Sequence, residues 1–211
     1  MISQERLDIF LETLEAGAEP IPPQIEEEAL KAGVPVISRD AQRLIRTILA
    51  AQKPDVILEI GTAVGFSSVF MCACSDARIV TIENYAKRIP VAKENIRLAG
   101  YEDRITLIEG NAGEILPSLT GPFDLIFLDA AQGQYIAFLP EIRRLLRSGG
   151  ILITDNVLMD GDLLEPHTAV QRRFRTIYKR LREYLRAIME DDGLVTTVLP
   201  VSDGLAVTVK K

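Results

Sequence analysis

Acidic and amide side chains stand at the ends of apolar runs along this chain. Glu83 follows the run ARIVTI, Asp129 follows FDLIFL, and the pair Asp155 and Asn156 follows ILIT. Such runs are typical of buried parallel strands, whose carboxyl ends meet at one edge of a sheet. That edge is where α/β proteins bind their ligands. Each residue alone also fits an ordinary strand end or turn, so it is the set that predicts a site.

The stretch VILEIGTAVGFSS, from Val56 to Ser68, is a candidate ligand-binding turn at the same edge. An apolar strand ends at Gly61, and Gly65 opens a segment with helical spacing. Glycine lets the backbone approach a ligand, and the first N–H groups of a helix face the same space. The spacing is neither the dinucleotide motif GxGxxG nor a P-loop, so a purely structural turn remains an alternative.

Glu83 is the candidate for holding a ribose. A carboxylate at the end of the second strand can accept hydrogen bonds from two adjacent hydroxyl groups, and its distance along the chain from Gly61 suits that role. The alternative is a solvated glutamate at a strand end. The preceding glycine turn favours the binding role.

The elements that would position these residues alternate along the chain, which predicts right-handed crossovers and a mostly parallel sheet. We expect strands over 56–60, 77–82, 104–109, 123–128, 151–154, 194–199 and 205–209, and helices over 3–15, 24–32, 38–52, 66–75, 85–99, 135–146 and 171–186. Ser38 is the expected N-cap of the third helix, and Gly149 and Gly150 are expected to form a turn. The chain reads as a single domain, 1–211, with an N-terminal helical cap over 1–53 and an α/β core over 54–211.

The first helix is expected to place Leu7, Phe10, Leu11 and Leu14 on one face. The three helices that precede the first strand could form a lid, a dimer contact or ordinary packing. Packing is the default interpretation.

Bulk properties indicate a folded cytoplasmic protein. The 211 residues carry a net charge of 24 − 30 = −6, which argues against general nucleic-acid binding but not against a local basic surface. We find no apolar run of the roughly 18–20 residues that span a membrane, and no signal peptide. Cys72 and Cys74 fit free thiols in a reducing compartment.

The stretches EIGTAVGFS, DAAQGQY, ITDNVL and PVSDGLAV, in this order, resemble the cation-dependent S-adenosylmethionine O-methyltransferases of the catechol and caffeoyl-CoA type. Within that family they are similar to the bacterial tRNA 5-hydroxyuridine methyltransferases. The resemblance covers the chain from about residue 34 onward. It implies a Rossmann-like seven-stranded sheet of order 3-2-1-4-5-7-6, with strand 7 antiparallel and N-terminal helices in front. It also implies a homodimer through those helices.

The resemblance assigns the cofactor site residue by residue. Glu59, Gly61 and Ser67 would line the methionine end of S-adenosylmethionine, and Ile37 would pack beside its sulfonium. Glu83 would hold the ribose, and Asn111 with Ala112 would border the adenine. The family usually has aspartate where Asn111 stands, which predicts altered adenine contacts and not a loss of binding. Asp129 would also border the cofactor.

The same resemblance makes Asp129, Asp155 and Asn156 the ligands of Mg²⁺, a hard ion that prefers oxygen. Catalysis is then assigned to Asp129, Gln132 and Asp155. Gln132 departs from the family, which has lysine there as the base for the substrate hydroxyl. An amide cannot take that proton, so the metal alone activates the hydroxyl, another group serves as base, or catalysis is impaired.

A basic segment favours RNA as the substrate. The stretch QRRFRTIYKRLREYLR, 171–186, repeats apolar residues at helical spacing, and Phe174, Ile177, Leu181, Leu185 and Ile188 are expected to face the core. The cations are expected on the other side, outside the metal pocket, where they could bind phosphates. The predicted RNA-binding residues are Arg172, Arg173, Arg175, Lys179, Arg180 and Arg182.

Together these interpretations predict a cytoplasmic, Mg²⁺-dependent enzyme that methylates 5-hydroxyuridine at the tRNA wobble position, with the anticodon region of tRNA as its partner. A catechol and 5-hydroxyuridine both offer two vicinal oxygens to a metal, so the chemistry alone does not choose between them. Methylation of a small catechol or phenylpropanoid is therefore the first alternative. A cofactor-binding protein with impaired catalysis is the second.

Overall fold

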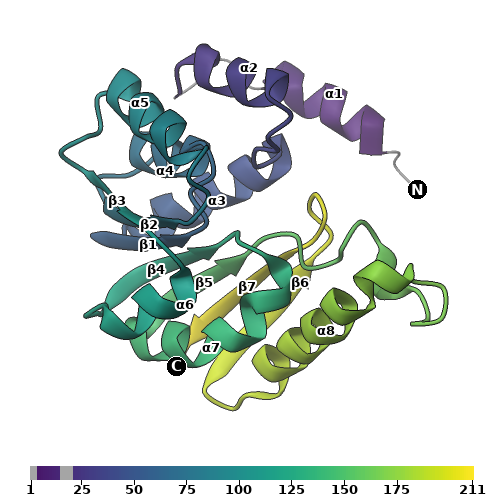
Figure 1. Ribbon diagram of the computed structural model, residues 1–211. Coiled ribbons are helices and arrows are strands. Elements are labelled where there is room, and N and C mark those ends of the chain that lie inside the picture. Colours follow the sequence, from purple (N-terminus) through teal and green to yellow (C-terminus); the bar gives the residue numbers. More distant parts are fainter. Residues whose placement is uncertain (1–3, 15–20) are drawn as a thin grey trace.

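A seven-stranded sheet forms the centre of the protein (Figure 1). The computed structural model describes residues 4–14 and 21–211. The strands are β1 (Val56–Ile60), β2 (Arg78–Glu83), β3 (Ile105–Glu109), β4 (Phe123–Leu128), β5 (Leu146–Thr154), β6 (Leu194–Leu199) and β7 (Leu205–Lys210). Their order is β3-β2-β1-β4-β5-β7-β6, and only the pairs that include β7 are antiparallel. The predicted fold, a methyltransferase-type sheet with strand 7 antiparallel, is confirmed.

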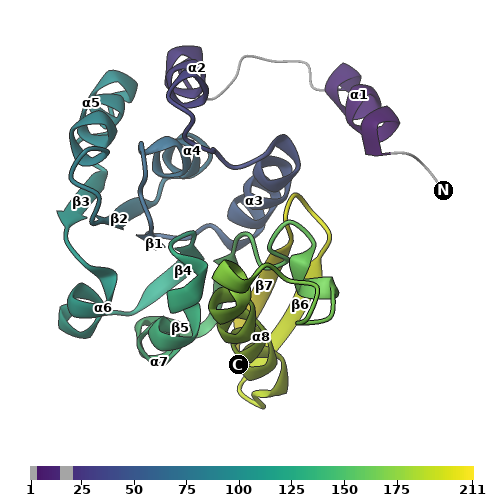
Figure 2. The ribbon, with the colours of Figure 1, turned by 45° about the vertical axis from the view of Figure 1, so that its right-hand side comes forward.

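Helices cover both faces of this sheet (Figure 2). The α-helices of the described residues are α1 (Gln4–Leu14), α2 (Pro23–Lys31), α3 (Arg39–Gln52), α4 (Phe66–Ala73), α5 (Ile89–Ala99), α6 (Ala112–Ile115), α7 (Tyr135–Leu145) and α8 (Arg175–Glu190). Helices α3, α4 and α5 lie on one side, and α6, α7 and α8 lie on the other. No helix in the described part of the chain is long and apolar enough to cross a membrane.

Two hydrophobic cores result, one on each side of the sheet, and β4 contributes to both. Leu125 and Phe127 pack into the core under α3 and α4, whereas Ile126 and Leu128 pack into the core under α7 and α8. All four side chains are fully buried. Alternate residues of a strand point to opposite faces, so a strand covered on both sides must be apolar throughout. The unbroken run FDLIFL follows from this position.

The helix α1 does not bury the face that its sequence pattern suggested. Phe10 is 56% exposed and Leu14 is 62% exposed. Figures 1 and 2 show α1 away from the sheet, and Figure 2 shows it apart from α2 as well, which accounts for the exposure of this face. The predicted limits Ser3 and Glu15 and the side chain of Leu7 lie outside the described residues.

Most predicted boundaries shift by one or two residues, and three larger or more consequential shifts concern β2, α5 and β5. Strand β2 includes Glu83 as its last residue, and α5 begins at Ile89 instead of residue 85. The intervening backbone is held by the Glu83 carboxylate, and Pro90 suits the first turn of a helix because it lacks an N–H. Gly149 and Gly150 lie inside β5, which starts at Leu146 and carries a register shift against β4.

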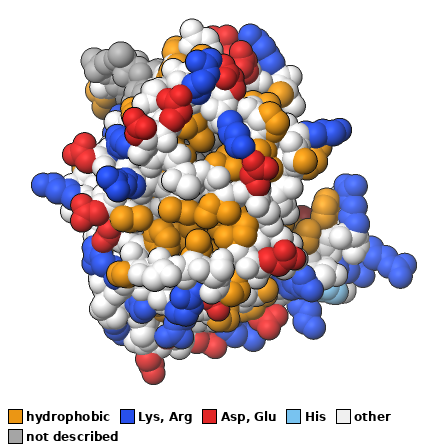
Figure 3. Space-filling model, turned by 60° about the vertical axis from the view of Figure 1, so that its left-hand side comes forward, with side chains coloured by type: hydrophobic (Ala, Val, Ile, Leu, Met, Phe, Trp, Pro, Cys, Tyr) orange, Lys and Arg blue, Asp and Glu red, His pale blue; other side chains and the backbone are white. Residues whose placement is uncertain are grey.

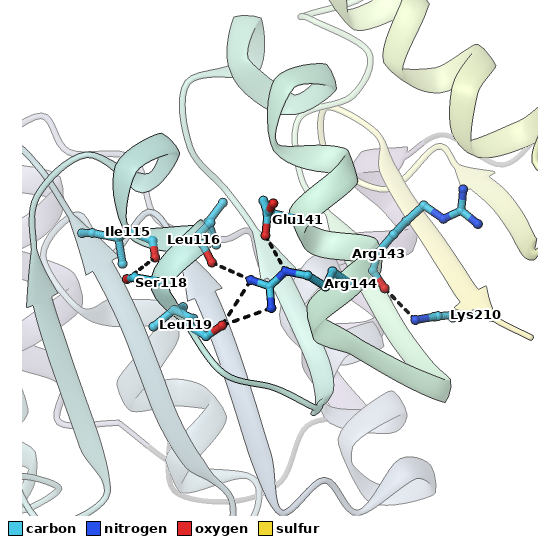
Figure 4. A network of polar contacts seen from close by, with 8 residues as sticks. All are labelled: Ile115, Leu116, Ser118, Leu119, Glu141, Arg143, Arg144 and Lys210. Carbon is cyan, nitrogen blue, oxygen red and sulfur yellow. Dashed lines mark hydrogen bonds and ion pairs between the residues drawn. The ribbon is translucent and has the colours of Figure 1, made fainter.

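A polar network fastens α7 to its neighbours away from the carboxyl edge (Figure 4). The Arg144 guanidinium donates to the carbonyl oxygens of Leu116 and Leu119 at 3.0 and 3.1 Å. Lys210, at the end of β7, donates to the carbonyl oxygens of Arg143 and Leu146 at 2.6 and 2.7 Å. These bonds hold α7 against the segment after α6 and against β7 at the edge of the sheet opposite the carboxyl ends of the parallel strands.

Candidate active site

The carboxyl ends of the strands surround a cavity of about 730 Å³. Five of the predicted cofactor residues lie in its wall: Gly61, Glu83, Asn111, Ala112 and Asp129. Ile37 and Ser67 lie with Gly61 and Asp129 around a much smaller adjoining cavity of about 20 Å³. A cavity of several hundred Å³ can enclose a ligand the size of a nucleoside derivative. The structure therefore brings residues from several separate segments to one binding space.

Gly61 follows β1 at the wall of this cavity, and the surrounding backbone leaves no room there for a side chain. Its φ of +106° is open only to glycine, and a Cβ there would stand 1.9 Å from the carbonyl oxygen of Asp129. The glycine was expected to leave room for a ligand. The structure shows that it first leaves room for the backbone at the end of β4.

Glu59 lies behind the turn and in neither cavity wall. Its carboxylate is fully buried and accepts hydrogen bonds from the hydroxyls of Ser67 and Thr81, each at 2.5 Å, and from Ser68. Burial raises the pKa of Glu59, and the three hydroxyl donors oppose that rise. Its observed contacts tie β1 to α4 and β2, while Ser67 reaches the small cavity.

Glu83 is fixed in the wall of the main cavity by backbone donors. Its Oε2 accepts from the N–H of Ala63 at 2.7 Å, and its Oε1 accepts from the N–H groups of Asn84 and Tyr85 at 2.9 and 2.7 Å. A carboxylate has about four acceptor positions, so one remains for a ligand hydroxyl. The turn after β1 and the turn after β2 are both organised around this one side chain.

Asn111 serves as the N-cap of α6, a helix that the sequence pattern did not reveal. Its Oδ1 accepts from the N–H of Gly113 at 2.8 Å. One of the two acceptor positions of the amide oxygen is therefore occupied, and the second acceptor position and the side-chain N–H₂ remain for a ligand. The expectation of altered adenine contacts at Asn111 stays a prediction.

Sequence reasoning missed several residues of this wall. Tyr85 and Arg88 follow Glu83 directly, and the Arg88 guanidinium lies 5.4 Å from the centre of the Tyr85 ring. Phe138 reaches the cavity from α7. The position of Tyr85 and Arg88 after a strand end was an available signal, whereas nothing in the pattern distinguished Phe138 from a core residue.

Asp129 and Asp155 form a second, more strongly charged part of the site. They follow Leu128 and Thr154, which are register partners in β4 and β5. Burial raises the pKa of Asp129 to about 8, and the negative charges of Asp155 and Glu59 add to the rise. Burial likewise raises the pKa of Asp155 to about 6. The N–H of Asn156, which donates to this carboxylate at 2.7 Å, lowers the pKa and so limits the rise. A buried and a half-buried carboxylate that disfavour each other's charge are suited to a cation between them.

Asn156 completes this group. Its φ of +55° is the left-handed conformation, which asparagine tolerates better than most residues. Gln132 Nε2 donates to the carbonyl oxygen of Asn156 at 2.8 Å. None of the ion pairs among the described residues includes Asp129 or Asp155. In the same described part, no group of three His, Cys, Asp or Glu is placed to hold a metal, so a cation here would depend on the Asn156 amide.

A second cavity, of about 500 Å³, lies on the other side of the segment that follows β4. It is lined by Ala130, Ala131, Gln132, Gly133, Gln134, Asn156, Ile177 and Arg180. Ala130, Ala131 and Gln134 line the first cavity too. Asp129 in the first wall and Asn156 in the second thus place the acidic group between two spaces.

The basic segment differs from its prediction in the residue at which its helix begins and in the side chains that the helix buries. A short 3-10 turn, Arg172–Phe174, precedes α8, which runs from Arg175 to Glu190. The side chains that α8 buries are Tyr178, Leu181, Tyr184 and Ile188, and the predicted core residues Phe174, Ile177 and Leu185 are half-buried. Two tyrosines with polar tips take core positions because their hydroxyls find partners, Tyr184 with Thr154 and Tyr178 with the carbonyl of Glu165.

The predicted RNA-binding cations divide into two groups. Arg172, Arg173, Lys179, Arg180 and Arg182 are exposed, whereas Arg175 is half-buried and donates to the carbonyl oxygens of Val170 and Thr168. Arg182 is exposed but donates to the carbonyl oxygen of Leu163. Arg180 was expected outside the pocket, and the structure places it in the wall of the second cavity.

Figure 3 shows Lys and Arg side chains gathered next to the pale blue of the histidine, whereas hydrophobic side chains occupy the centre of that face and acidic and basic side chains are interspersed around them. His167 precedes the basic segment and packs against Tyr178, with ring centres 5.5 Å apart. The local excess of positive charge is therefore real on a protein of net charge −6.

Comparison with known proteins places this geometry in a family. The model of the O-methyltransferase family matches residues 25–211. The catechol O-methyltransferases of Mycobacterium tuberculosis and Niastella koreensis are 34% and 32% identical to the chain, covering 75% and 86% of it and 74% and 86% of their own lengths. A crystal structure of a Podospora anserina methyltransferase with bound S-adenosylhomocysteine has a TM-score of 0.83 at 29% identity, covering 100% of this chain and 97% of that one. The chain belongs to the O-methyltransferase family, of the type that includes the catechol and caffeoyl-CoA enzymes.

Proposed function

We propose that the protein uses S-adenosylmethionine and Mg²⁺ to methylate the 5-hydroxyl of 5-hydroxyuridine at the wobble position of tRNA. The observation that carries the proposal is the placement of Asp129, Asp155 and Asn156 between two cavities, one of them bordered by a basic helix. A methyl donor and an RNA base would then meet at the acidic group.

The first cavity suits the cofactor. The remaining acceptor position on Glu83 would take a ribose hydroxyl, and the segment of Asn111 and Ala112 would border the adenine. Gly61, Ser67 and Ile37 would surround the methionine end, where the small cavity adjoins the large one. The Podospora anserina relative, which holds S-adenosylhomocysteine, supports this assignment by its fold and identity.

The acidic group suits a divalent cation. Asp129 and Asp155 would each supply a carboxylate oxygen, and Asn156 would supply its amide oxygen, a set that Mg²⁺ favours. The pKa values of about 8 and about 6 show how strongly the site resists two negative charges by itself. When bound, the ion would lower the pKa of a substrate hydroxyl and hold two vicinal oxygens.

Gln132 would position the substrate and not deprotonate it. Methyl transfer breaks the sulfur–methyl bond and forms an oxygen–methyl bond, so the hydroxyl proton must leave the site. An amide has no usable basicity. Because Gln132 Nε2 donates to the carbonyl of Asn156, the side chain is held in the wall of the second cavity with its amide oxygen still available as an acceptor.

RNA as the substrate rests on the cations around the second cavity. Arg172 and Lys179 make no ion pair with the described acidic residues, and Arg180 lies in the cavity wall. An excess of unpaired cations attracts phosphates. The second candidate, methylation of a small catechol, draws its support from the catechol O-methyltransferases among the relatives. A catechol gives the basic residues no role.

Nucleoside mass spectrometry of tRNA from a deletion strain tests the proposal. We expect 5-methoxyuridine to disappear and 5-hydroxyuridine to accumulate, and the purified protein to restore the methyl group in the presence of Mg²⁺ but not of EDTA. Unchanged tRNA, together with turnover of a catechol by the purified protein, would replace the proposal by the second candidate. Cofactor binding without turnover of either substrate would indicate the remaining alternative, a cofactor-binding protein with impaired catalysis.

We also propose that the protein forms a homodimer through its N-terminal helices. The exposed apolar side chains Ile9, Phe10 and Leu14 on α1 support such a contact. Light scattering should give twice the mass of one chain, and Phe10→Glu should shift it toward the monomer. A monomeric wild-type protein at all concentrations would contradict the dimer.

A further inference from the structure

The second cavity combines three kinds of wall. Ala130, Ala131 and Ile177 give it apolar surface, and Gln132 and Gln134 give it amide groups. Arg180 is its only charged residue among the described residues that line it. Apolar faces with a few amide groups suit a flat aromatic ring that has hydrogen-bonding edges. One positive charge at the wall of such a cavity suits a ligand that carries an anionic group in the same molecule as that ring.

Arg180 has most of its binding capacity unused. One nitrogen, Nη1, donates to the carbonyl oxygen of Gly133 at 3.1 Å. The side chain is exposed, and no carboxylate pairs with it in the described part of the chain. A guanidinium carries five N–H donors in a planar fork that matches the oxygens of a phosphate. The bond to Gly133 holds the guanidinium at the cavity wall and leaves its other N–H donors without a partner among the described residues.

We infer that the second cavity binds one nucleotide, with its base beside Gln132 and Asn156 and its phosphate on Arg180. The inference rests on the proposed function and specifies how the target nucleotide is recognised. Arg180 is then a specificity-determining residue that separates this protein from enzymes acting on unphosphorylated phenols. The other cations of the segment would contact phosphates farther along the RNA, whereas Arg180 would contact the nucleotide that reacts.

The cavity's position supports this assignment over a general phosphate site. Ala130, Ala131 and Gln134 form a wall common to both cavities, and Asn156 stands at the acidic group. A base in the second cavity is therefore adjacent to the methyl donor's space. A phosphate bound to Arg172 or Lys179 has no such relation, because neither residue lines a cavity near the acidic group.

NMR titration of the S-adenosylhomocysteine-loaded protein tests the inference without requiring turnover. The ligands are uridine, its 3′-monophosphate and its 5′-monophosphate. We expect one monophosphate to bind about tenfold more tightly than uridine, which is the size of one charge-assisted contact. The largest shifts should fall on the amides of Gln132, Gly133 and Gln134.

Variants locate the phosphate contact. Arg180→Ala should reduce the preference for the monophosphate to about twofold or less, and Arg180→Lys should retain part of it, because lysine keeps the charge but not the fork. Arg97→Ala is the matched control, since Arg97 is an exposed arginine of α5 on the other side of the sheet, paired with Glu94. A melting temperature like that of the wild type shows that each variant is folded.

Two results would overturn the inference. The first is that the wild type binds uridine and both monophosphates equally, or binds none of them. The second is that Arg180→Ala keeps the wild-type preference for the monophosphate. These outcomes differ from failure of the proposed function. A protein that methylates tRNA but shows no phosphate preference retains its function and loses this site. A protein that prefers the monophosphate but methylates no tRNA retains the site and loses the proposed substrate.

Discussion

The two halves of the sheet's carboxyl edge hold their negative charges in opposite ways. Around β1 and β2, Glu59 and Glu83 accept three hydrogen bonds each from hydroxyls and backbone N–H groups. Around β4 and β5, no hydrogen bond among the described residues ends on the Asp129 carboxylate, and Asp155 accepts one from Asn156. The chain itself therefore supplies three donors to each carboxylate of the first pair, whereas the second pair receives a single donor among the described residues.

This difference separates a preorganised half from a half completed by its ligands. Hydrogen bonds to a carboxylate stabilise its charged form, and burial beside another carboxylate destabilises it. In the proposed complex, Glu83 would therefore receive a neutral ribose without rearrangement. Asp129 and Asp155 would both be charged only with a cation bound between them. Variants in each half should consequently fail in different ways.

The largest effect is expected from Asp155→Ala. Methyl transfer should fall by about 10³-fold, because the cation loses one of its two carboxylates. The melting temperature without added metal should not fall, since one of two repelling charges is gone. Asp155→Asn, which keeps the shape, should lose activity similarly. Retained activity with a lowered melting temperature would reverse the comparison and make Asp155 a structural residue.

Glu83→Ala should weaken S-adenosylmethionine binding by about 1–3 kcal/mol, because a charge-assisted ribose contact is lost and three backbone N–H groups lose their acceptor. Glu109→Ala is the matched control. Glu109 is the register partner of Glu83 in β3, but it is exposed and paired with Lys93 at 2.6 Å. Calorimetry should show little change in cofactor affinity for the control. An equal loss of affinity in both variants would contradict the assignment of Glu83 to the cofactor site.

Reversal of Arg172 and Lys179 to glutamate should lower tRNA methylation about tenfold at low salt and reduce the salt dependence of tRNA binding by a slope of about 2. The control variant changes Lys93 and Arg97 to glutamate, which alters net charge equally on α5. Cofactor affinity should be the same in both variants. Equal loss of tRNA methylation in the control would show that net charge alone matters.

The acidic pair predicts how stability depends on pH. Asp129 and Asp155 have pKa values of about 8 and about 6 when folded, above the value of about 4 in an unfolded chain. The folded protein therefore binds more protons, so without metal its free energy of unfolding should fall as pH rises from about 4 to about 8. We expect a fall of about 1–2 kcal/mol, since Asp129 is partly open to solvent. Denaturant titrations with and without Mg²⁺ measure it, and a metal-free stability that rises over this range would be contrary to the assignment.

The smallest effect is expected from Gln132→Lys. A lysine amine can still donate to the carbonyl of Asn156, and in its neutral form it can take the hydroxyl proton. The rate should rise a few-fold at the alkaline end of the pH profile, where more of the amine is neutral, on the order of 0.5–1 kcal/mol in barrier. Gln134→Lys, two residues farther along the same wall, is the control. A lower rate for Gln132→Lys alone would show that the amide binds the substrate.

Much of the fold was predictable because it depends on local pattern. Each central strand is covered on both faces, so FDLIFL and ILIT are apolar throughout and their polar ends stand out. The positions of Glu83, Asp129 and Asp155 at one edge follow from that pattern and from parallel pairing.

The rest depended on contacts between distant segments. Glu59 belongs to a strand end in the sequence, but Ser68 and Thr81 enclose it from α4 and β2. Asn111 could face a ligand or cap a helix, and only the backbone of α6 decides. Arg180 was recognised as a cation, yet its place in a cavity wall requires the packing of α8 against the segment after β4. Periodicity carries no information of this kind.

Ligands in the two cavities would share one wall, and they would be thermodynamically coupled wherever either of them shifts it. Ala130, Ala131 and Gln134 face both spaces, so any shift that one ligand imposes on this segment changes the free energy of binding the other. Such coupling is reciprocal: a cofactor that tightens nucleotide binding by some factor must itself be bound more tightly by that same factor when the nucleotide is present. If the methylated and demethylated forms of the cofactor set this segment differently, one short stretch of backbone sets the order in which substrate enters and product leaves.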